Sequence, residues 1–232
     1  MTAHLPEYSA AFVRDGVAVI PQVLGEQACV QLDARLALGT GAAGSPGSRN
    51  LLAQDWCAAL LPEMRAHPAV AAILPASHVA VQCTYFEKSR DTNWLVPIHQ
   101  DLSIPVQRRV DHPALTGWSE KEGQCFVQAP VDLLQQLVAL RVHIDDCGEV
   151  DGPLRVVAGS HTQGIISAQQ APSIRSNMQT HLCVVQRGGI VAMRPLVLHA
   201  SSKATGSGLR RVLHFVFGPT SLPYGLQWAL SV

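Results

Sequence analysis

From about residue 78 onward the chain reads as a series of short strands separated by turns, and this pattern constrains the fold more than any other feature. Segments rich in β-branched and aromatic residues alternate with connections that carry glycine, proline, aspartate or asparagine. We expect strands at 79–87, 138–145, 154–157, 182–186, 190–194 and 210–217. Short strands that follow a helical segment predict an α+β, mainly β protein with an antiparallel double-sheet barrel as its core.

The first 75 residues have a different, mainly helical character. Helices are expected at 6–15, 25–38 and 55–66, with a shorter one after Pro68 and a short strand at 16–21. In the second helix Cys29, Leu32 and Leu36 share one face, which indicates packing against a core. Residues 39–48, GTGAAGSPGS, have the composition of a mobile surface loop.

A length of 232 residues fits one domain, 1–232, whose barrel core we place at 78–220. Residues 102–136 form a long insertion of mixed character, which we interpret as a lid or binding loop. Acidic and basic residues number 17 each, so charge gives no reason to expect a nucleic-acid partner. The chain has no apolar run of membrane-spanning length, and residues 1–11 do not resemble a signal peptide.

The six cysteines are scattered without Cys-x-x-Cys pairs, and we interpret them as reduced thiols. Together with the absence of a signal peptide, they predict a cytoplasmic protein. We expect a monomer or a small homo-oligomer that does not act at a membrane.

Two histidines and an aspartate have the pattern of a metal site. His99 and Asp101 stand two residues apart, so they project from the same side of an extended chain. His199 follows a hundred residues later and could reach them from another strand. Two histidines and one carboxylate on one face of an octahedron leave three positions open, the arrangement of non-haem Fe(II) oxygenases.

A second His-x-Asp pair, His143 and Asp145, competes for this role, because His199 also follows it, 56 residues on. Spacing alone does not separate the two pairs. His143 stands in a strongly apolar strand, which favours a structural role. Asp145 begins the sequence Asp145-Asp146-Cys147-Gly148, which has the composition of a strand-ending turn.

Several blocks of sequence follow one another in a specific order over most of residues 79–217. They are Val81-Gln82 to Lys88, Asn93-Trp94, Pro97-Ile98-His99-Gln100-Asp101, Ile144-Asp145-Asp146, Asp151-Gly152-Pro153-Leu154-Arg155 to Gly159-Ser160-His161, and Leu198-His199-Ala200-Ser201 to Arg210-Arg211. In this order the chain resembles the phytanoyl-CoA dioxygenase-like (PhyH) family of Fe(II)/2-oxoglutarate-dependent oxygenases. The resemblance implies a double-stranded β-helix, a cupin-like jelly roll, with N-terminal helices packed on one sheet.

The resemblance also chooses between the two His-x-Asp pairs. In the family His-Gln-Asp supplies the ligands, whereas the Ile-Asp-Asp and Gly-Ser-His blocks are structural, so His161 is not a ligand. The implied iron ligands are His99, Asp101 and His199, with 2-oxoglutarate as co-substrate and O2 as oxidant. An aspartate at position 101, rather than the small residue of halogenating relatives, argues against halogenation.

The resemblance further implies a site for the 2-oxoglutarate carboxylate. The family's spacing of eleven residues from the distal histidine selects Arg210 rather than Arg211, and Ser201 faces the same way as His199. Gln82 and Thr84 share a strand face near the co-substrate. Arg141 replaces a tryptophan common in relatives, and we expect it to meet an anion of either the co-substrate or the substrate.

Four residues are candidates for the substrate rim, although each has an ordinary structural explanation: Lys88, Trp94, Trp118 and Arg155. The expected activity is oxidation of a C–H bond in a small organic metabolite, by default hydroxylation, with release of succinate and CO2. Two other functions stay open: a cupin-like metal-binding protein without oxygenase activity, and a metal-dependent isomerase or hydrolase.

Overall fold

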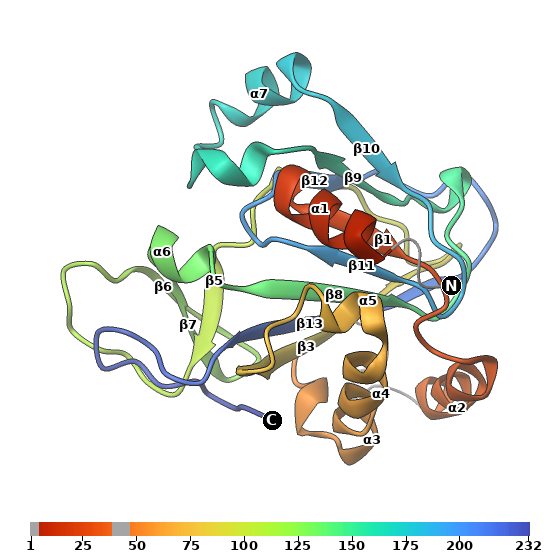
Figure 1. Ribbon diagram of the computed structural model, residues 1–232, viewed down its shortest axis with the longest axis horizontal. Coiled ribbons are helices and arrows are strands. Elements are labelled where there is room, and N and C mark those ends of the chain that lie inside the picture. The colour runs from red at the N-terminus through yellow and green to blue at the C-terminus, as the bar shows by residue number, and fades with distance from the viewer. Residues whose placement is uncertain (1–4, 39–46) are drawn as a thin grey trace.

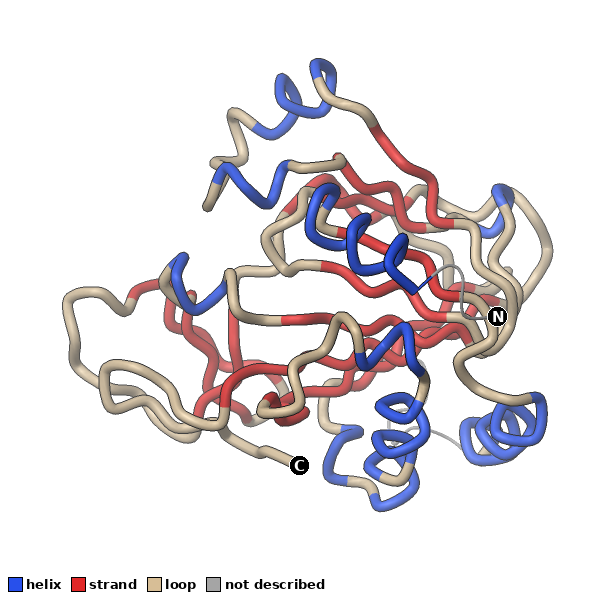
Figure 2. The backbone as a smooth tube through the Cα atoms, in the orientation of Figure 1, coloured by secondary structure: helices blue, strands red, loops and turns tan. Residues whose placement is uncertain are grey.

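The computed structural model describes residues 5–38 and 47–232, and its centre is formed by antiparallel sheets (Figure 1). Strands lie in the middle of the molecule and helices at its periphery (Figure 2). Most of the loop predicted at 39–48 lies outside the described residues. Its last two residues form a short edge strand, β2 (Gly47–Ser48).

The larger sheet has six strands. In spatial order they are β1 (Val17–Ile20), β11 (Ile190–Met193), β8 (Val138–His143), β13 (Arg210–Pro219), β3 (His78–Lys88) and β2. All neighbouring strands are antiparallel. The barrel therefore includes strands from the N-terminal part, which the predicted core boundary at residue 78 had left out.

The smaller sheet faces the larger one. Its four strands, in spatial order, are β10 (Thr180–Cys183), β9 (Leu154–Val157), β12 (His199–Ser201) and β4 (Val96–His99). A buried cluster joins the two sheets, with Ala139 and Val191 of the larger sheet packed against Val156 of the smaller one. The strand predicted at 182–186 begins earlier, at Thr180, and ends at Cys183.

The helices of the N-terminal part cover the outer face of the six-stranded sheet (Figure 1). They are α1 (Leu5–Asp15), α2 (Glu26–Ala37), η1 (Leu51–Ala53), α3 (Asp55–Ala58), α4 (Leu60–Ala66) and α5 (Pro68–Ala71). The prediction of one helix over 55–66 was wrong, because the helix is interrupted at Ala59. Pro62 then lies in the first turn of α4, where the missing amide hydrogen costs least.

The insertion at 102–136 is a folded unit. It contains a three-stranded sheet of β5 (Ser103–Val106), β7 (Gln124–Gln128) and β6 (Thr116–Lys121), followed by α6 (Val131–Leu134). Its own buried cluster includes Val106, Val127 and Leu133. The remaining elements are η2 (Glu149–Asp151), η3 (Ser160–Gln163) and α7 (Ala171–Asn177).

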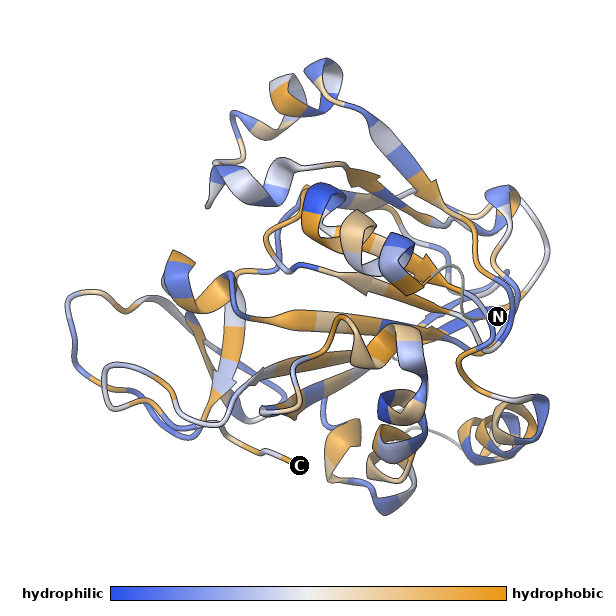
Figure 3. Cartoon of the chain, viewed as in Figure 1, coloured by the Kyte–Doolittle hydropathy of each residue, from blue (hydrophilic) through white to orange (hydrophobic). Residues whose placement is uncertain are grey.

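Alternation along β13 decides which side chains face the barrel interior. Leu213, Phe215 and Phe217 pack under the helices on the outer face, so Arg210 and His214 point inward. The same strands are hydrophobic over most of their length, whereas the helices carry hydrophilic residues outward (Figure 3). The few polar residues on the inner face are therefore conspicuous, and they surround the site described next.

Candidate metal centre

Two strands of the smaller sheet bring the predicted metal ligands together. His99 ends β4 and is paired in register with His199, which begins β12. Asp101 Oδ1 lies 3.6 Å from His99 Nε2, and Asp101 Oδ2 lies 3.7 Å from His199 Nε2. One potential ligand atom from each residue lies within 4.8 Å of the other two, so a single metal ion can bring all three into its coordination sphere with small side-chain adjustments.

A hydrogen bond to its own strand fixes each imidazole. His99 Nδ1 lies 2.8 Å from the carbonyl oxygen of Pro97, and His199 Nδ1 lies 2.9 Å from that of Val197. A carbonyl oxygen only accepts, so each Nδ1 donates and each neutral ring keeps its lone pair on Nε2. Both lone pairs are on the Asp101 side, which is the tautomer that a metal ligand requires.

The protonation states of the three residues suit a metal site. Burial lowers the pKa of His199 to about 4, so its ring is neutral at pH 7. Burial alone would raise the pKa of Asp101, but the neighbouring imidazoles of His199 and His99 outweigh this effect and lower it. An ionised carboxylate and a neutral imidazole are the forms in which these side chains bind metals.

The residue between the ligands, Gln100, anchors the ligand loop. Its buried amide donates to the carbonyl oxygens of Gly164 (2.8 Å) and Leu196 (2.6 Å), and its Oε1 accepts from Ile166 N (2.7 Å). The sequence marked Gln100 only as the middle of the motif. Its three hydrogen bonds tie the ligand pair to two other segments of the barrel, which limits the movement of both ligands.

The competing pair at 143–145 is used differently. Asp145 accepts hydrogen bonds from the backbone N and the side-chain Nε of Arg211, at 2.8 and 2.9 Å. His143 is buried inside the barrel, and neither of its ring nitrogens has a hydrogen-bond partner among the described residues. Asp145 is therefore committed to an ion pair, as its position at a strand end predicted.

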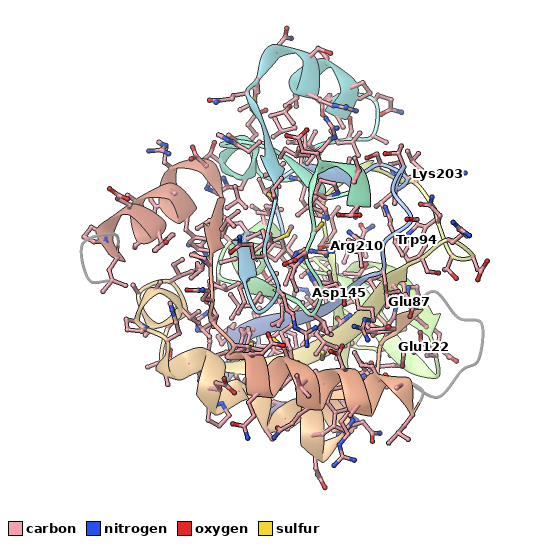
Figure 4. All side chains as sticks on the ribbon, turned by 90° about the vertical axis from the view of Figure 1, so that its right-hand side faces the viewer. Glu87, Trp94, Glu122, Asp145, Lys203 and Arg210 are labelled. Carbon is pink, nitrogen blue, oxygen red and sulfur yellow. The ribbon has the colours of Figure 1, made fainter. Side chains whose placement is uncertain are left out.

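Two buried cations lie side by side at one end of the barrel interior. Lys88 and Arg210 are paired in register across β3 and β13 and are 0% and 3% exposed. Lys88 Nζ donates to Ser201 Oγ at 2.7 Å, and Ser201 Oγ and Arg210 Nη1 both donate to the carbonyl oxygen of Gly152. Neither cation makes an ion pair within the described chain. Figure 4 shows Arg210 and Trp94 on the right-hand side of Figure 1.

This unpaired positive charge changes the ionisation of the cluster. Burial lowers the pKa of Lys88 to about 8, and the guanidinium of Arg210 lowers it further. Burial and then Arg210 also lower the pKa of Arg141, to about 10. The Nε atoms of Arg141 and Arg210 are buried without a hydrogen-bond partner among the residues described. An anion bound here would satisfy these donors and neutralise the repulsion.

The predicted residues Arg141, Gln82 and Thr84 lie on the inner face of the larger sheet, with His214 between them. Thr84 and Arg141 are the register partners of His214 on its two neighbouring strands. Gln82 Nε2 donates to Thr84 Oγ1 at 2.8 Å. Burial and then the Arg141 guanidinium lower the pKa of His214 to about 3. All four side chains line the same cavity as the metal ligands.

This cavity has a volume of about 520 Å³, within the range of small-molecule sites. Its polar side carries the His-Asp-His group, Arg141, Arg210 and Ser201, and apolar side chains such as Phe126, Leu137 and Val216 form the opposite wall. Part of this wall comes from the folded insertion at 102–136, so this segment does contribute to the pocket, as predicted.

The four residues predicted at the substrate rim have different positions. Trp94 lines the cavity, and Lys88 lies inside the barrel with its Nζ 5.7 Å from the centre of the Trp94 ring. Trp118 is outside the cavity lining and packs against Arg109, whose guanidinium lies 5.6 Å from its ring. Arg155 is exposed on β9 and does not line the cavity either.

Two pocket residues had no prediction. His214 was hidden in the alternating apolar pattern of β13. Lys121 ends β6 and lines the cavity mouth, with its Nζ 4.9 Å from the centre of the Phe126 ring. Its sequence signal is absent, because an isolated lysine in an insertion is usually a surface residue.

The sequence model of the family described as phytanoyl-CoA dioxygenase (PhyH) matches residues 12–212. The chain belongs to this family. Membership of the PhyH family confirms the resemblance and supports the predicted oxidative chemistry that depends on non-haem iron and 2-oxoglutarate. None of the curated protein sequences compared with the chain matches it significantly.

Solved structures share the fold at low sequence identity. AviO1 from Streptomyces viridochromogenes Tue57 is 20% identical with a TM-score of 0.67, and the match covers 96% of this chain and 98% of AviO1. The non-haem α-ketoglutarate-dependent epimerase SnoN from nogalamycin biosynthesis is 15% identical with a TM-score of 0.68, over 97% and 88% of the two chains. HygX from Streptomyces hygroscopicus, crystallised with nickel, 2-oxoglutarate and hygromycin B, is 20% identical with a TM-score of 0.64, over 92% and 87%. These matches confirm the predicted jelly-roll fold.

Within residues 5–38 and 47–232, none of the helices has both the length and the apolar character needed to cross a membrane. All six cysteines are free thiols, and five of them are buried.

Proposed function

We propose that this protein is an Fe(II)- and 2-oxoglutarate-dependent oxygenase that hydroxylates a C–H bond of a small organic metabolite. One observation carries the proposal: two correctly oriented imidazoles and a carboxylate share a cavity with a buried pair of cations that has no anion of its own. The first group has the chemistry of an Fe(II) site, and the second has the chemistry of a carboxylate site.

The residues fit the metal. His99, Asp101 and His199 would hold it through two nitrogens and one oxygen, the donor set that Fe(II) accepts. Iron and 2-oxoglutarate, when bound, supply the oxidation of the C–H bond with release of succinate and CO2.

The residues also fit the co-substrate. A dicarboxylate needs a cation for its distal carboxylate, and the fork of Arg210 together with Lys88 Nζ and Ser201 Oγ provides one. We therefore assign Lys88 to the co-substrate rather than to the substrate rim. The orphaned Nε of Arg210 supports this assignment, because a buried donor without a partner is costly.

The remaining pocket residues orient the substrate and exclude water. The apolar wall, which includes Phe126 and Val216, would hold the carbon skeleton, and Trp94 and Lys121 would contact it near the mouth. HygX binds hygromycin B and SnoN is an epimerase, so relatives of this fold accept elaborate small molecules and catalyse other outcomes than hydroxylation. We propose a small-molecule substrate and a cytoplasmic monomer or small homo-oligomer with reduced thiols.

A metal-binding protein without oxygenase activity, or a metal-dependent hydrolase or isomerase, is the alternative. The cation cluster argues against both, because neither needs a buried carboxylate site beside the metal.

The proposal is tested by turnover of 2-oxoglutarate. The purified protein with Fe(II), ascorbate and O2 should release succinate, slowly without substrate and faster with the correct member of a metabolite panel. His199→Ala should abolish succinate release. Absence of succinate release from wild-type protein that binds iron would refute the oxygenase assignment.

A further inference from the structure

His214 lies beside the metal ligands but neither the sequence motifs nor the family resemblance gives it a role. It is 6% exposed, stands on the inner face of β13 and lines the cavity. Its Nε2 lies 3.9 Å from Asp101 Oδ2, almost as close as His199 Nε2 at 3.7 Å. Three imidazoles therefore surround one carboxylate, and their hydrogen positions decide what each can do.

Arg141 fixes the hydrogen of His214. Arg141 Nη1 lies 3.1 Å from His214 Nδ1. A guanidinium has donors only, so His214 Nδ1 must accept, and the ring carries its single hydrogen on Nε2. His214 is thus a donor on the Asp101 side, whereas His99 and His199 present lone pairs there.

This difference separates His214 from the metal ligands. A nitrogen that carries a hydrogen cannot bind a metal, so His214 is not a fourth ligand. A monodentate carboxylate has one oxygen on the metal and one that is free to accept a hydrogen bond. Among the three imidazoles, only His214 Nε2 can donate to that second oxygen.

The donor is held by rigid elements. Arg141 and His214 are register partners on the adjacent strands β8 and β13, and Arg141 is only 7% exposed. The guanidinium lies 5.5 Å from the centre of the Phe86 ring, a cation–π contact that holds it from a third strand, β3. The Arg141–His214 pair therefore cannot turn away from Asp101 without disturbing the sheet.

We propose that His214 is a positioning residue for the metal centre: Arg141 sets its tautomer, and its Nε2–H holds the Asp101 carboxylate in the orientation that binds the metal. The proposal rests on the proposed function, because it assumes that Asp101 is a ligand. The 3.9 Å separation exceeds a hydrogen bond, and contacts of this kind commonly shorten when a site is loaded.

The test compares three substitutions at His214 in metal binding. Leu removes the donor, and Asn keeps the acceptor for Arg141 but is too short to reach Asp101. Gln places an amide NH2 near the position of Nε2 and should rescue. Equilibrium dialysis of chelator-stripped protein against Co(II), with the visible Co(II) spectrum as a second readout, reports on the site without turnover. Val212→Ala, on the same strand and face but outside the cavity lining, controls for loosening of the barrel.

We expect His214→Leu and His214→Asn to raise the Kd for Co(II) by about 10- to 100-fold, the range found when a partner of a metal ligand is removed. His214→Gln and Val212→Ala should stay within about threefold of wild type on the same scale, and the Co(II) spectrum should change only in the Leu and Asn variants. Unchanged affinity in His214→Leu, or equal loss in the Leu and Gln variants, would overturn the role of His214 alone. If wild-type protein binds no Co(II), or binds it equally well as His99→Ala, the proposed function fails and this inference fails with it.

Discussion

Lys88 and Arg210 face each other across β3 and β13, both buried, and no carboxylate of the described chain pairs with either. Two like charges in one buried position are unfavourable unless an anion joins them. The protein keeps them 11 residues from the metal histidines on each side of the sequence, Lys88 before His99 and Arg210 after His199. This symmetry about the metal ligands is the strongest structural reason to expect a bound dicarboxylate.

Replacing Lys88 by Met should weaken 2-oxoglutarate binding and stabilise the ligand-free protein. Loss of a charged hydrogen bond costs about 1.5–3 kcal/mol, so the Kd for 2-oxoglutarate should rise by about 10- to 150-fold. Removal of a buried unpaired charge should raise the Tm of the ligand-free protein. Calorimetric titration and thermal unfolding test both effects. A Lys88→Met variant with a lower Tm and unchanged affinity would contradict the assignment of Lys88 to the co-substrate.

Affinity for 2-oxoglutarate should depend on pH through Lys88. Burial and Arg210 lower its pKa from 10.5 to about 8, so raising the pH from 7 to 9 removes most of its charge. The Kd for 2-oxoglutarate should therefore rise several-fold over this range in wild type and stay flat in Lys88→Met. Between pH 8 and 10.5 the unfolded chain binds this proton and the folded chain does not, so Lys88 makes the ligand-free protein more stable as the pH rises. An affinity profile that is identical in the two proteins would exclude Lys88 as the titrating group.

The extent to which sequence predicted the structure differs between the parts of the site. The ligands His99, Asp101 and His199 could be proposed because a short motif and a family spacing identify them. The strands that carry them, β4 and β12, were not predicted, since three or four residues are too few to show alternation. Their pairing is a tertiary contact.

Lys88 and His214 show a second limit. A lysine at the end of a strand is usually exposed, and only the register of β3 with β13 reveals that Lys88 lies beside Arg210 inside the barrel. His214 is one residue in an apolar strand, and its meaning depends on the Arg141 side chain from the neighbouring strand. Likewise the insertion at 102–136 folds as a small sheet because its own cluster is buried, which local patterns did not indicate.

Gln100 should stabilise the metal centre as well as the fold. Gln100→Leu would leave three buried backbone groups without partners, at a cost of about 1–3 kcal/mol for each unsatisfied group. We expect a clear loss of unfolding free energy in denaturant, together with weaker Co(II) binding, because the Asp101 loop loses its anchor. Gln163→Leu, whose amide contacts only the sulfur of Met178 at the surface, is the control. Equal stability of the two variants would show that the Gln100 hydrogen bonds are not needed.

Two glycines with the same backbone conformation separate strain from steric overlap. Gly188 and Gly123 have φ angles of +77° and +75°. A Cβ at Gly188 would lie 2.4 Å from the carbonyl oxygen of Leu24, whereas nothing lies within 4 Å of a Cβ at Gly123. Gly123→Ala should cost about 1 kcal/mol from backbone strain, and Gly188→Ala should cost distinctly more. Chemical denaturation of the two variants measures the difference, and equal losses would contradict the close packing of this turn against the N-terminal segment.

The most direct test of the account is the anaerobic complex of the protein with Fe(II) and 2-oxoglutarate. Chelation of iron by the co-substrate beside two imidazoles and a carboxylate should give a weak visible charge-transfer band. The account predicts this band in wild type, its loss in His99→Ala, and its recovery only at higher 2-oxoglutarate concentration in Lys88→Met. Wild-type protein that gives no band and retains Zn(II) after purification would contradict the oxygenase assignment.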